Sequence, residues 1–157
     1  MSEPGEPREL VLDTSVAVKF HVPEERYKES RRLQSSFEDG AVSLLAPGTV
    51  LPEVFNAFWQ KHRRDELTCD EVHIGWDLIS ELPLTLYAPE DLIGRAVEIS
   101  FATNVIIYDA LFLAFAEDAD TVMITDDGKL IKAVKGTPYA RLAHPLTDVD
   151  SLVSETR

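Results

Sequence analysis

The stretch VIIYDALFLAFAEDADTVMITDDGK, Val105 to Lys129, decides the fold because a long apolar segment is followed directly by a short apolar one. The run IIYDALFLAFAE is rich in Ala, Leu and Phe, which favours a helix that is buried on most of its faces. The next run, TVMIT, contains β-branched residues, is typical of a strand, and ends at Asp126, Asp127 and Gly128. The stretch therefore predicts a buried helix that leads into a strand with an acidic end.

The carboxylates of this stretch lie where a purely structural acid is least expected. Asp109 falls near the start of the apolar helix, and buried carboxylates need a partner, a hydrogen bond or a metal. The first turn is also the place where the helix dipole favours a negative charge. Asp126 and Asp127 follow a strand, and ligands bind at the carboxyl ends of the strands in open α/β sheets. We therefore look for a functional site at this edge.

Predicted strands and helices alternate along the rest of the chain. The predicted strands cover 9–13, 41–46, 84–87, 121–125 and 141–143, and the predicted helices cover 16–20, 25–37, 50–64, 68–82, 89–101, 106–117 and 129–135. This alternation indicates an α/β fold in three layers, with helices on both faces of a parallel sheet. Thr68 to Glu71 forms a capping box, and Thr103 or Asn104 is a candidate cap for the helix that contains Asp109.

Length and composition indicate one globular domain, with 157 residues of which 45% are hydrophobic and 27% charged. We assign the domain to 9–147, between a flexible lead, 1–8, and a weakly structured tail, 148–157. The start of the chain lacks the parts of a signal peptide, and no apolar run approaches the roughly 20 residues of a membrane span. The single cysteine, Cys69, fits a reducing compartment. These observations predict a cytoplasmic protein without membrane association.

The net charge of −13 disfavours nucleic-acid binding at face value, although bound divalent metal inverts the field of an acidic site. Four carboxylates follow a strand or open a helix, so they can converge at one edge of the sheet: Asp13, Glu53, Asp109 and Asp127. Any one of the 28 acids is most often a solvated surface charge. A cluster, however, repels itself unless protons or cations intervene, and Mg²⁺ or Mn²⁺ prefers such oxygen ligands. The set predicts phosphodiester cleavage by a metal-activated water.

Other residues are candidates with equally simple structural explanations. Thr14 and Ser15, next to Asp13, are helix caps or hydroxyl ligands. The candidate RNA contacts are Lys129, Lys132, Arg63 and Arg64, although a solvated helix face explains them equally well. The aromatic stripe of Phe55, Phe58 and Trp59 is interpreted as core, with a dimer interface as the second interpretation. No histidine has a partner at zinc spacing, and no phosphate-binding glycine loop is present.

The order and spacing of four motifs resemble those of the PIN-domain ribonucleases, and in particular of VapC-type toxins from toxin–antitoxin systems. The motifs are LVLDTSV at 10–16, LPEVFNAF at 51–58, YDALFLAFAE at 108–117 and ITDDGKL at 124–130. The resemblance implies a PIN-like fold with a five-stranded parallel sheet, and Mg²⁺ or Mn²⁺ held by catalytic residues Asp13, Glu53, Asp109 and Asp127. It also implies RNA as substrate, a homodimer, and inhibition by a cognate antitoxin, for which the negative charge predicts a basic segment.

The last motif contains a position that departs from the family pattern. Thr125 and Asp127 match a Thr-x-Asp ending, whereas Asp126 stands where the family often has a small or neutral residue. Asp126 therefore either contacts the metal or only caps the next helix.

Two other classes of function compete with a nuclease. A phosphoaspartate receiver domain is also small and acidic, but it needs an aspartate after the middle strand, where this chain offers Glu53 within a helix. A catalytically silent PIN-like module would bind RNA or protein without cleaving it. The intact set of four acids disfavours this second alternative.

Overall fold

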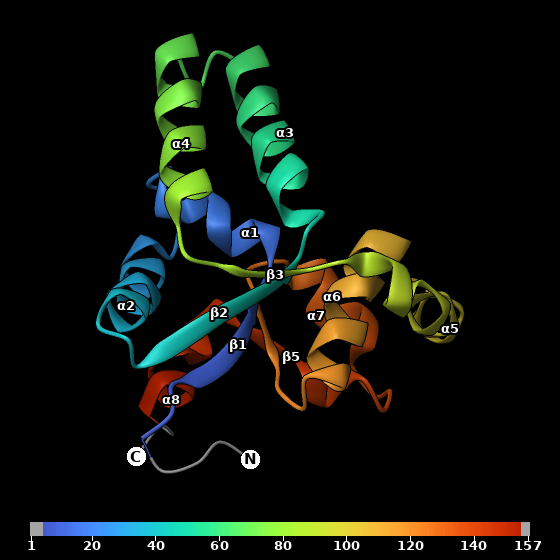
Figure 1. Cartoon of the computed structure of the whole chain (residues 1–157). Coiled ribbons are helices and arrows are strands. Elements are labelled where there is room, and N and C mark those ends of the chain that lie inside the picture. The colour runs from blue at the N-terminus through green and yellow to red at the C-terminus, as the bar shows by residue number, and fades with distance from the viewer. Residues whose placement is uncertain (1–4, 155–157) are drawn as a thin grey trace.

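The computed structural model describes residues 5–154, which form a domain around a five-stranded sheet (Figure 1). The strands are β1 (Arg8–Leu12), β2 (Val42–Pro47), β3 (Thr85–Tyr87), β4 (Met123–Thr125) and β5 (Ala143–Pro145). Their order is β3-β2-β1-β4-β5 and every pairing is parallel, which confirms the predicted sheet. β1 lies in the middle, where its apolar Leu10, Val11 and Leu12 are fully buried.

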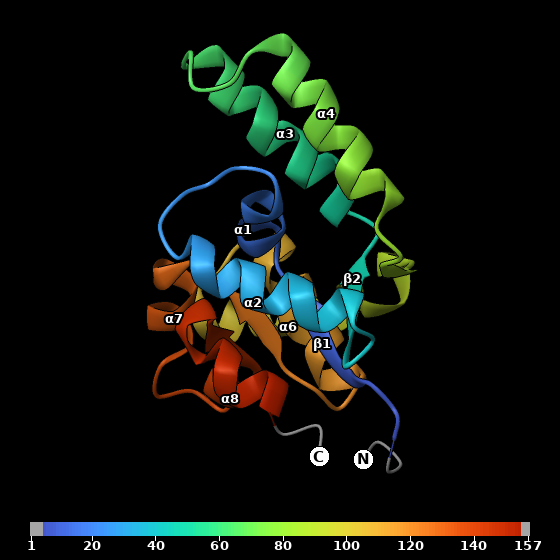
Figure 2. The same cartoon turned by 90° about the vertical axis from the view of Figure 1, so that its left-hand side faces the viewer.

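Helices cover both faces of this sheet and confirm the three layers. The helices are α1 (Thr14–Ala17), α2 (Tyr27–Glu38), α3 (Val50–Arg63), α4 (Cys69–Glu81), α5 (Ile93–Thr103), α6 (Ile107–Asp118), α7 (Gly128–Val134) and α8 (Val149–Ser154). Single 3₁₀ turns are η1 (Val18–Phe20), η2 (Pro89–Leu92), η3 (Ala140–Leu142) and η4 (Leu146–Asp148). Figure 2 shows α2 and α8 in front of β1 and α6 behind it, and Figure 1 shows α3 and α4 projecting as a pair.

α6 is the central helix, as its composition predicts. Every residue from 110 to 116 is buried, because the helix contacts β1, β2 and β4 on one side and α5 on another. Across residues 5–154 no single helix is long and apolar enough to cross a bilayer. The segments Pro89–Thr103 and Ile107–Asp118 reach that apolar length only together, as a pair bent by 113°. This burial fixes the start of α6 beside the end of β1.

The ends of the chain differ from the prediction. The predicted weakly structured tail contains α8, which packs on α2 through buried Val149, Leu152 and Val153; residues 155–157 lie outside the described part. Of the predicted lead, residues 1–4 also lie outside the described part, and Arg8 already pairs with Val42 in the sheet. The last strand is 143–145 instead of 141–143, because the preceding residues form the turn η3.

Two local predictions are wrong and one is confirmed. Neither Thr103 nor Asn104 caps α6, whose N-cap is Ile106; Asn104 instead ends α5 with a left-handed φ of 61°. Phe58 is buried, but Phe55 and Trp59 are 40% and 47% exposed, so they are not core residues. The capping box of α4 is present, with the Thr68 hydroxyl accepting from the Glu71 amide at 3.2 Å and the reciprocal bond at 2.7 Å.

Candidate active site

An acidic cleft of about 380 Å³ opens where β1 ends. The cleft is lined by the segment after β1, by α3, by the start of α6 and by the loop after β4. All four predicted acids, Asp13, Glu53, Asp109 and Asp127, belong to this lining, as do Thr14, Ser15 and Asp126. In the sheet, β1 lies between β2 and β4. The chain runs from β1 through β2 to β3 on one side of β1 and then continues with β4 and β5 on the other side. The cleft at the end of β1 therefore lies at the topological switch point of the sheet.

A larger cavity of about 690 Å³ lies away from these residues. Its lining includes Arg8 and Glu9 at the start of β1, Thr121 before β4, and Arg141. These positions belong to the amino ends of the strands, which is not where parallel sheets carry their sites. The smaller, acidic cleft is therefore the candidate active site.

Asp13 is the most buried member of the set, with 5% of its surface exposed. Its Oδ2 accepts hydrogen bonds from the Ser15 hydroxyl at 2.6 Å and from the Thr125 hydroxyl at 2.7 Å. Burial raises the pKa of Asp13, the two hydroxyl hydrogen bonds oppose this shift, and the charge of Asp127 adds to it. The hydrogen bonds thus fix the orientation of the carboxylate, while burial destabilises its charged form.

The two hydroxyls also position the loop after β4. The Ser15 Oγ accepts from the amide of Asp126 at 2.9 Å, and the Thr125 Oγ1 accepts from the amide of Asp127 at 3.1 Å. Each hydroxyl therefore donates to the Asp13 carboxylate and accepts from the backbone of the loop. These bonds fix the position of Asp127 relative to Asp13.

Glu53 and Asp109 each lie in the first turn of a helix, as the sequence predicts. Burial raises the pKa of Glu53 to about 7; the neighbouring Thr49 hydroxyl opposes this shift, and the charges of Asp13 and Asp109 add to it. Burial also raises the pKa of Asp109 to about 6, with the charges of Asp13 and Asp127 contributing. Two hydrophilic atoms of the cleft, Glu53 Oε2 and Thr14 Oγ1, are buried without a hydrogen-bond partner among the described residues.

Asp126 and Asp127 have different contacts, and the prediction that Asp126 caps the next helix is wrong. The capping residue is Asp127, whose Oδ1 accepts from the amides of Lys129 at 2.9 Å and Leu130 at 3.3 Å. Asp126 forms a forked ion pair with Arg26 and lies 3.0 Å from the Lys19 ammonium. Burial by itself would raise the pKa of Asp126, but hydrogen bonds from Arg26 and Lys19 keep it below the usual value.

Sequence reasoning missed two cations of the cleft, Lys19 and Lys61. The spacing contained a signal for Lys61, which lies eight residues after Glu53 and therefore on the same face of α3. Lys19 is the one charge in an apolar run, VAVKF. By contrast, the predicted RNA contacts are not part of this lining: Arg63, Arg64, Lys129 and Lys132.

The chemistry of the cleft fits a hard divalent cation. Within residues 5–154, no three His, Cys, Asp or Glu side chains are close enough together to hold a metal ion as they stand. The cleft nevertheless gathers the four predicted carboxylates, of which three have raised pKa values, and it contains a buried Glu53 oxygen without a partner. Such an oxygen is destabilising until a proton or a cation binds it. The donor set therefore suits Mg²⁺ or Mn²⁺.

We expect Glu53→Gln to raise the melting temperature of the metal-free protein at pH 7.5. Between pH 4.5 and about 7 the folded state binds the Glu53 proton more tightly than the unfolded state, so this stabilisation is lost as the pH rises through 7. From pH 5.5 to pH 7.5 in chelator, the wild type should lose on the order of 2 to 4 °C more than the variant. Scanning calorimetry measures both, with the exposed Glu90→Gln as control. Equal pH dependence of wild type and variant would contradict this account.

Comparison with known proteins identifies the family to which this fold belongs. The family model of the PIN domain matches residues 10–136. Ribonuclease VapC3 of Pyrobaculum aerophilum is 29% identical over 125 residues, which cover 77% of this chain and 91% of the relative. The crystal structure of PAE2754, also from Pyrobaculum aerophilum, has a TM-score of 0.66 at 17% identity and covers 96% of this chain and 97% of that one.

A toxin–antitoxin complex from Klebsiella pneumoniae has a similar fold, with a TM-score of 0.58 at 15% identity, and covers 87% of this chain and 97% of the matched one. At such low identities the two solved structures establish the fold, which agrees with the resemblance of the motifs. The family match itself extends from the middle of β1 to the end of α7 and includes all four acids of the cleft. The chain belongs to the PIN domain family.

Proposed function

We propose that this protein is an endoribonuclease that requires Mg²⁺ or Mn²⁺ and is the toxin of a VapBC-type toxin–antitoxin pair. The observation that carries the proposal is the convergence of four carboxylates, Asp13, Glu53, Asp109 and Asp127, in one cleft at the switch point of the sheet. RNA as substrate is supported by the relative that is named a ribonuclease. The receiver-domain alternative is set aside because the chain has the PIN family pattern instead.

The four carboxylates would hold the cation, and each is positioned by the fold in its own way. Asp13 is oriented by two hydroxyls and Asp127 by its bonds to α7, whereas Glu53 and Asp109 are presented by the first turns of α3 and α6. A bound cation would lower the pKa of water and polarise a phosphoryl oxygen. Glu53, with an unpartnered oxygen and a pKa raised to about 7 in the metal-free cleft, would release its proton when it binds the cation.

The first test separates this enzyme from a catalytically silent PIN-like module. Purified protein is expected to cleave RNA with Mg²⁺ or Mn²⁺ and not in excess chelator. Asp13→Asn and Asp109→Asn should each lower the cleavage rate by on the order of 10² to 10³, as the loss of a charge-stabilising group does. Circular dichroism should show that both variants remain folded, because Asn keeps the shape of the side chain. Undiminished cleavage in chelator, or by both variants, would refute the metal mechanism.

The proposal includes a cognate antitoxin that inserts a basic segment into the cleft. Its support is the acidic lining, together with the fold shared with a solved toxin–antitoxin complex. An arginine of the partner can form a forked pair with a cleft carboxylate, as Arg26 does with Asp126 within this chain. Such a pair would exclude the cation and thereby inhibit cleavage.

The antitoxin complex is expected to weaken about tenfold or more between 0.1 and 0.5 M NaCl, because screening shortens the range of the charge attraction. Asp127→Asn should weaken it at low salt while α7 stays folded, since Asn is as good an N-cap as Asp. Calorimetric titration measures both effects, with exposed Asp70→Asn as the matched control. A complex that is indifferent to salt and to Asp127→Asn would be held by apolar contacts alone.

We also infer a homodimer, for which α5 provides an apolar surface. Ile93, Val97 and Phe101 lie four residues apart on α5 and are 45%, 39% and 88% exposed. Ile106 and Tyr108 follow at the start of α6 and are also exposed. A run of exposed large apolar residues is typical of an interface.

Phe101→Glu is expected to shift the protein from dimer to monomer in sedimentation velocity experiments at micromolar concentration, because a charge at the centre of an apolar interface is left without water or partner. Trp59→Glu on the exposed face of α3 is the matched control and should leave the dimer intact. A dimer broken by Trp59→Glu and not by Phe101→Glu would move the interface to α3, and a monomeric wild type would refute the dimer.

A further inference from the structure

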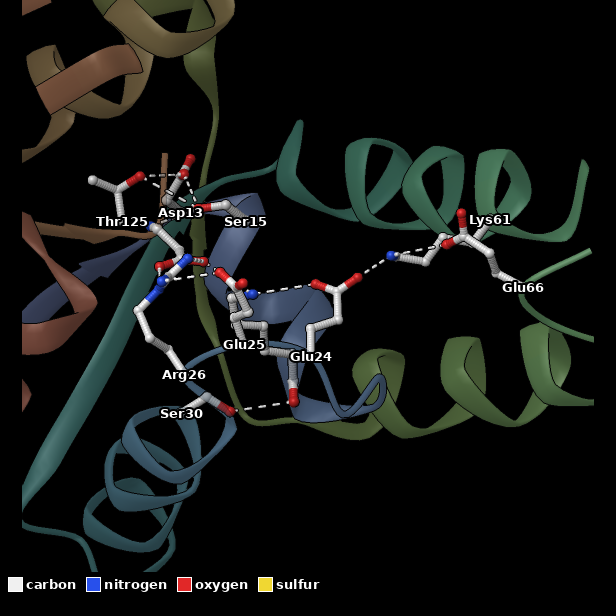
Figure 3. Close-up of polar contacts among 11 residues, drawn as sticks. Asp13, Ser15, Glu24, Glu25, Arg26, Ser30, Lys61, Glu66 and Thr125 are labelled. Atoms are coloured by element: carbon white, nitrogen blue, oxygen red, sulfur yellow. Dashed lines mark hydrogen bonds and ion pairs between the residues drawn. The ribbon is translucent and has the colours of Figure 1, made fainter. Parts of the chain in front are cut away.

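Two lysines converge on one carboxylate in the wall of the acidic cleft, and the metal chemistry proposed above uses neither of them. Glu24 lies between them: its Oε2 is 3.2 Å from the Lys19 ammonium, and its Oε1 accepts a hydrogen bond from Lys61. Figure 3 shows Glu24 reaching across to Lys61 on α3. Two ammonium groups therefore surround one anion position beside the four acids.

Both ammonium groups are largely removed from solvent, with side chains 5% and 13% exposed. Burial of a positive charge is destabilising unless partners compensate for the lost water, and here carboxylates do so. Besides Glu24, Lys19 pairs with Asp126 at 3.0 Å, and Lys61 lies 3.4 Å from Glu66. An ammonium has three N–H donors, so within the described structure each lysine keeps one donor for a further acceptor in the cleft.

The fold holds these lysines in place before any ligand arrives. Glu53, Ala57 and Lys61 follow at intervals of four residues on α3, so one face of the helix presents an acid and a base to the same cleft. Lys19 is on η1, where its backbone carbonyl accepts from the buried Ser30 hydroxyl at 3.2 Å. The two lysines that flank the position are therefore held by helical elements, α3 and η1.

RNA in this cleft needs cationic partners beyond a metal ion. Phosphate contacts supply much of the affinity of nucleic-acid binding, and a lysine binds phosphate as a point charge. The charged side chains of the lining are six carboxylates and two ammonium groups, Lys19 and Lys61. A phosphate beside the cleaved one would be repelled everywhere else along this wall.

We propose that Lys19 and Lys61 form a phosphate-binding subsite, which holds an RNA backbone phosphate next to the one that is cleaved, and that Glu24 occupies this position in the free protein. The inference rests on the proposed function, because it assigns a substrate contact to the same cleft. An entering phosphate competes with the Glu24 carboxylate for the two ammonium groups. Loss of the Glu24 charge and loss of the Lys61 charge should therefore change RNA affinity in opposite directions.

A purely structural network leads to a different expectation. Glu24→Gln and Lys61→Met both break the same ion pair, so a network that only stabilises the fold would respond to both in the same direction. Lys61 is the better position to test, because Lys19 is 4% exposed and its removal would take a buried cation from two carboxylates, Glu24 and Asp126, at once. Lys28→Met and Glu25→Gln are matched controls, since they remove the same charges at exposed positions outside the cleft.

The experiment measures binding of a fluorescent 12-nucleotide single-stranded RNA by anisotropy with Mg²⁺ present, in an Asp109→Asn background that slows cleavage. Lys61→Met is expected to weaken binding about fivefold to tenfold, to lower the salt slope of log K by about 0.7, and to act on all sequences alike. Glu24→Gln is expected to strengthen binding about twofold to fivefold, by removal of the competing charge. In the catalytically intact chain, Lys61→Met should raise KM and leave kcat within about twofold.

If the wild type cleaves RNA, either of two binding results would overturn the subsite. One is weaker RNA binding by both Lys61→Met and Glu24→Gln, and the other is changes in affinity no larger than those of the two controls. Failure of the wild type to cleave RNA with either metal would instead refute the proposed function. A second measurement does not depend on RNA cleavage. Inorganic pyrophosphate should raise the melting temperature of the wild type and not that of Lys61→Met, and an equal rise in both proteins would also overturn the subsite.

Discussion

The hydrogen bond from the Thr125 hydroxyl to the buried carboxylate of Asp13 is the interaction on which the cleft depends. It joins the ends of two neighbouring strands, β1 and β4, whose backbones are already paired through Val11 and Leu12. Ser15 completes the junction by donating to the same carboxylate oxygen. Because both hydroxyls also accept from the loop after β4, the position of Asp127 follows from the position of Asp13. The sheet thereby positions carboxylates that would otherwise repel one another.

The cleft is divided into two electrostatic halves according to the neighbours of each acid. Glu24 and Asp126 have lysine or arginine partners, and their pKa values are lowered in spite of burial. The pKa values of three other acids are raised, by burial and by the negative charges of neighbouring carboxylates: Asp13, Glu53 and Asp109. The first half is neutralised within the chain, and the second half leaves negative charge for a ligand. Carboxylates of the same type are thus paired with cations in one half of the cleft and, among the described residues, have no cationic partner in the other.

The sequence contained much of this arrangement, because local rules determine where strand ends and helix starts fall. The burial of α6, the parallel sheet and the common cleft of the four acids all follow from apolar runs that end in carboxylates. The pairing of Asp126 with Arg26 could not be predicted, because it joins residues 100 positions apart through a loop without a periodic pattern. Phe55 and Trp59 were misassigned because periodicity identifies an apolar face but not what covers it, and α3 projects from the sheet.

The pairing of β1 with β4 also determines when, during synthesis, the four acids can assemble. Asp13 and Thr125 are separated by 112 residues, and β2, β3 and the helices up to α6 are made between them. Asp13 is therefore synthesised early, whereas Asp127 is added only at residue 127 of 157. A polypeptide still being translated therefore lacks part of the acidic cleft for most of its elongation, because the four acids can meet only after β4 and Asp127 have been made.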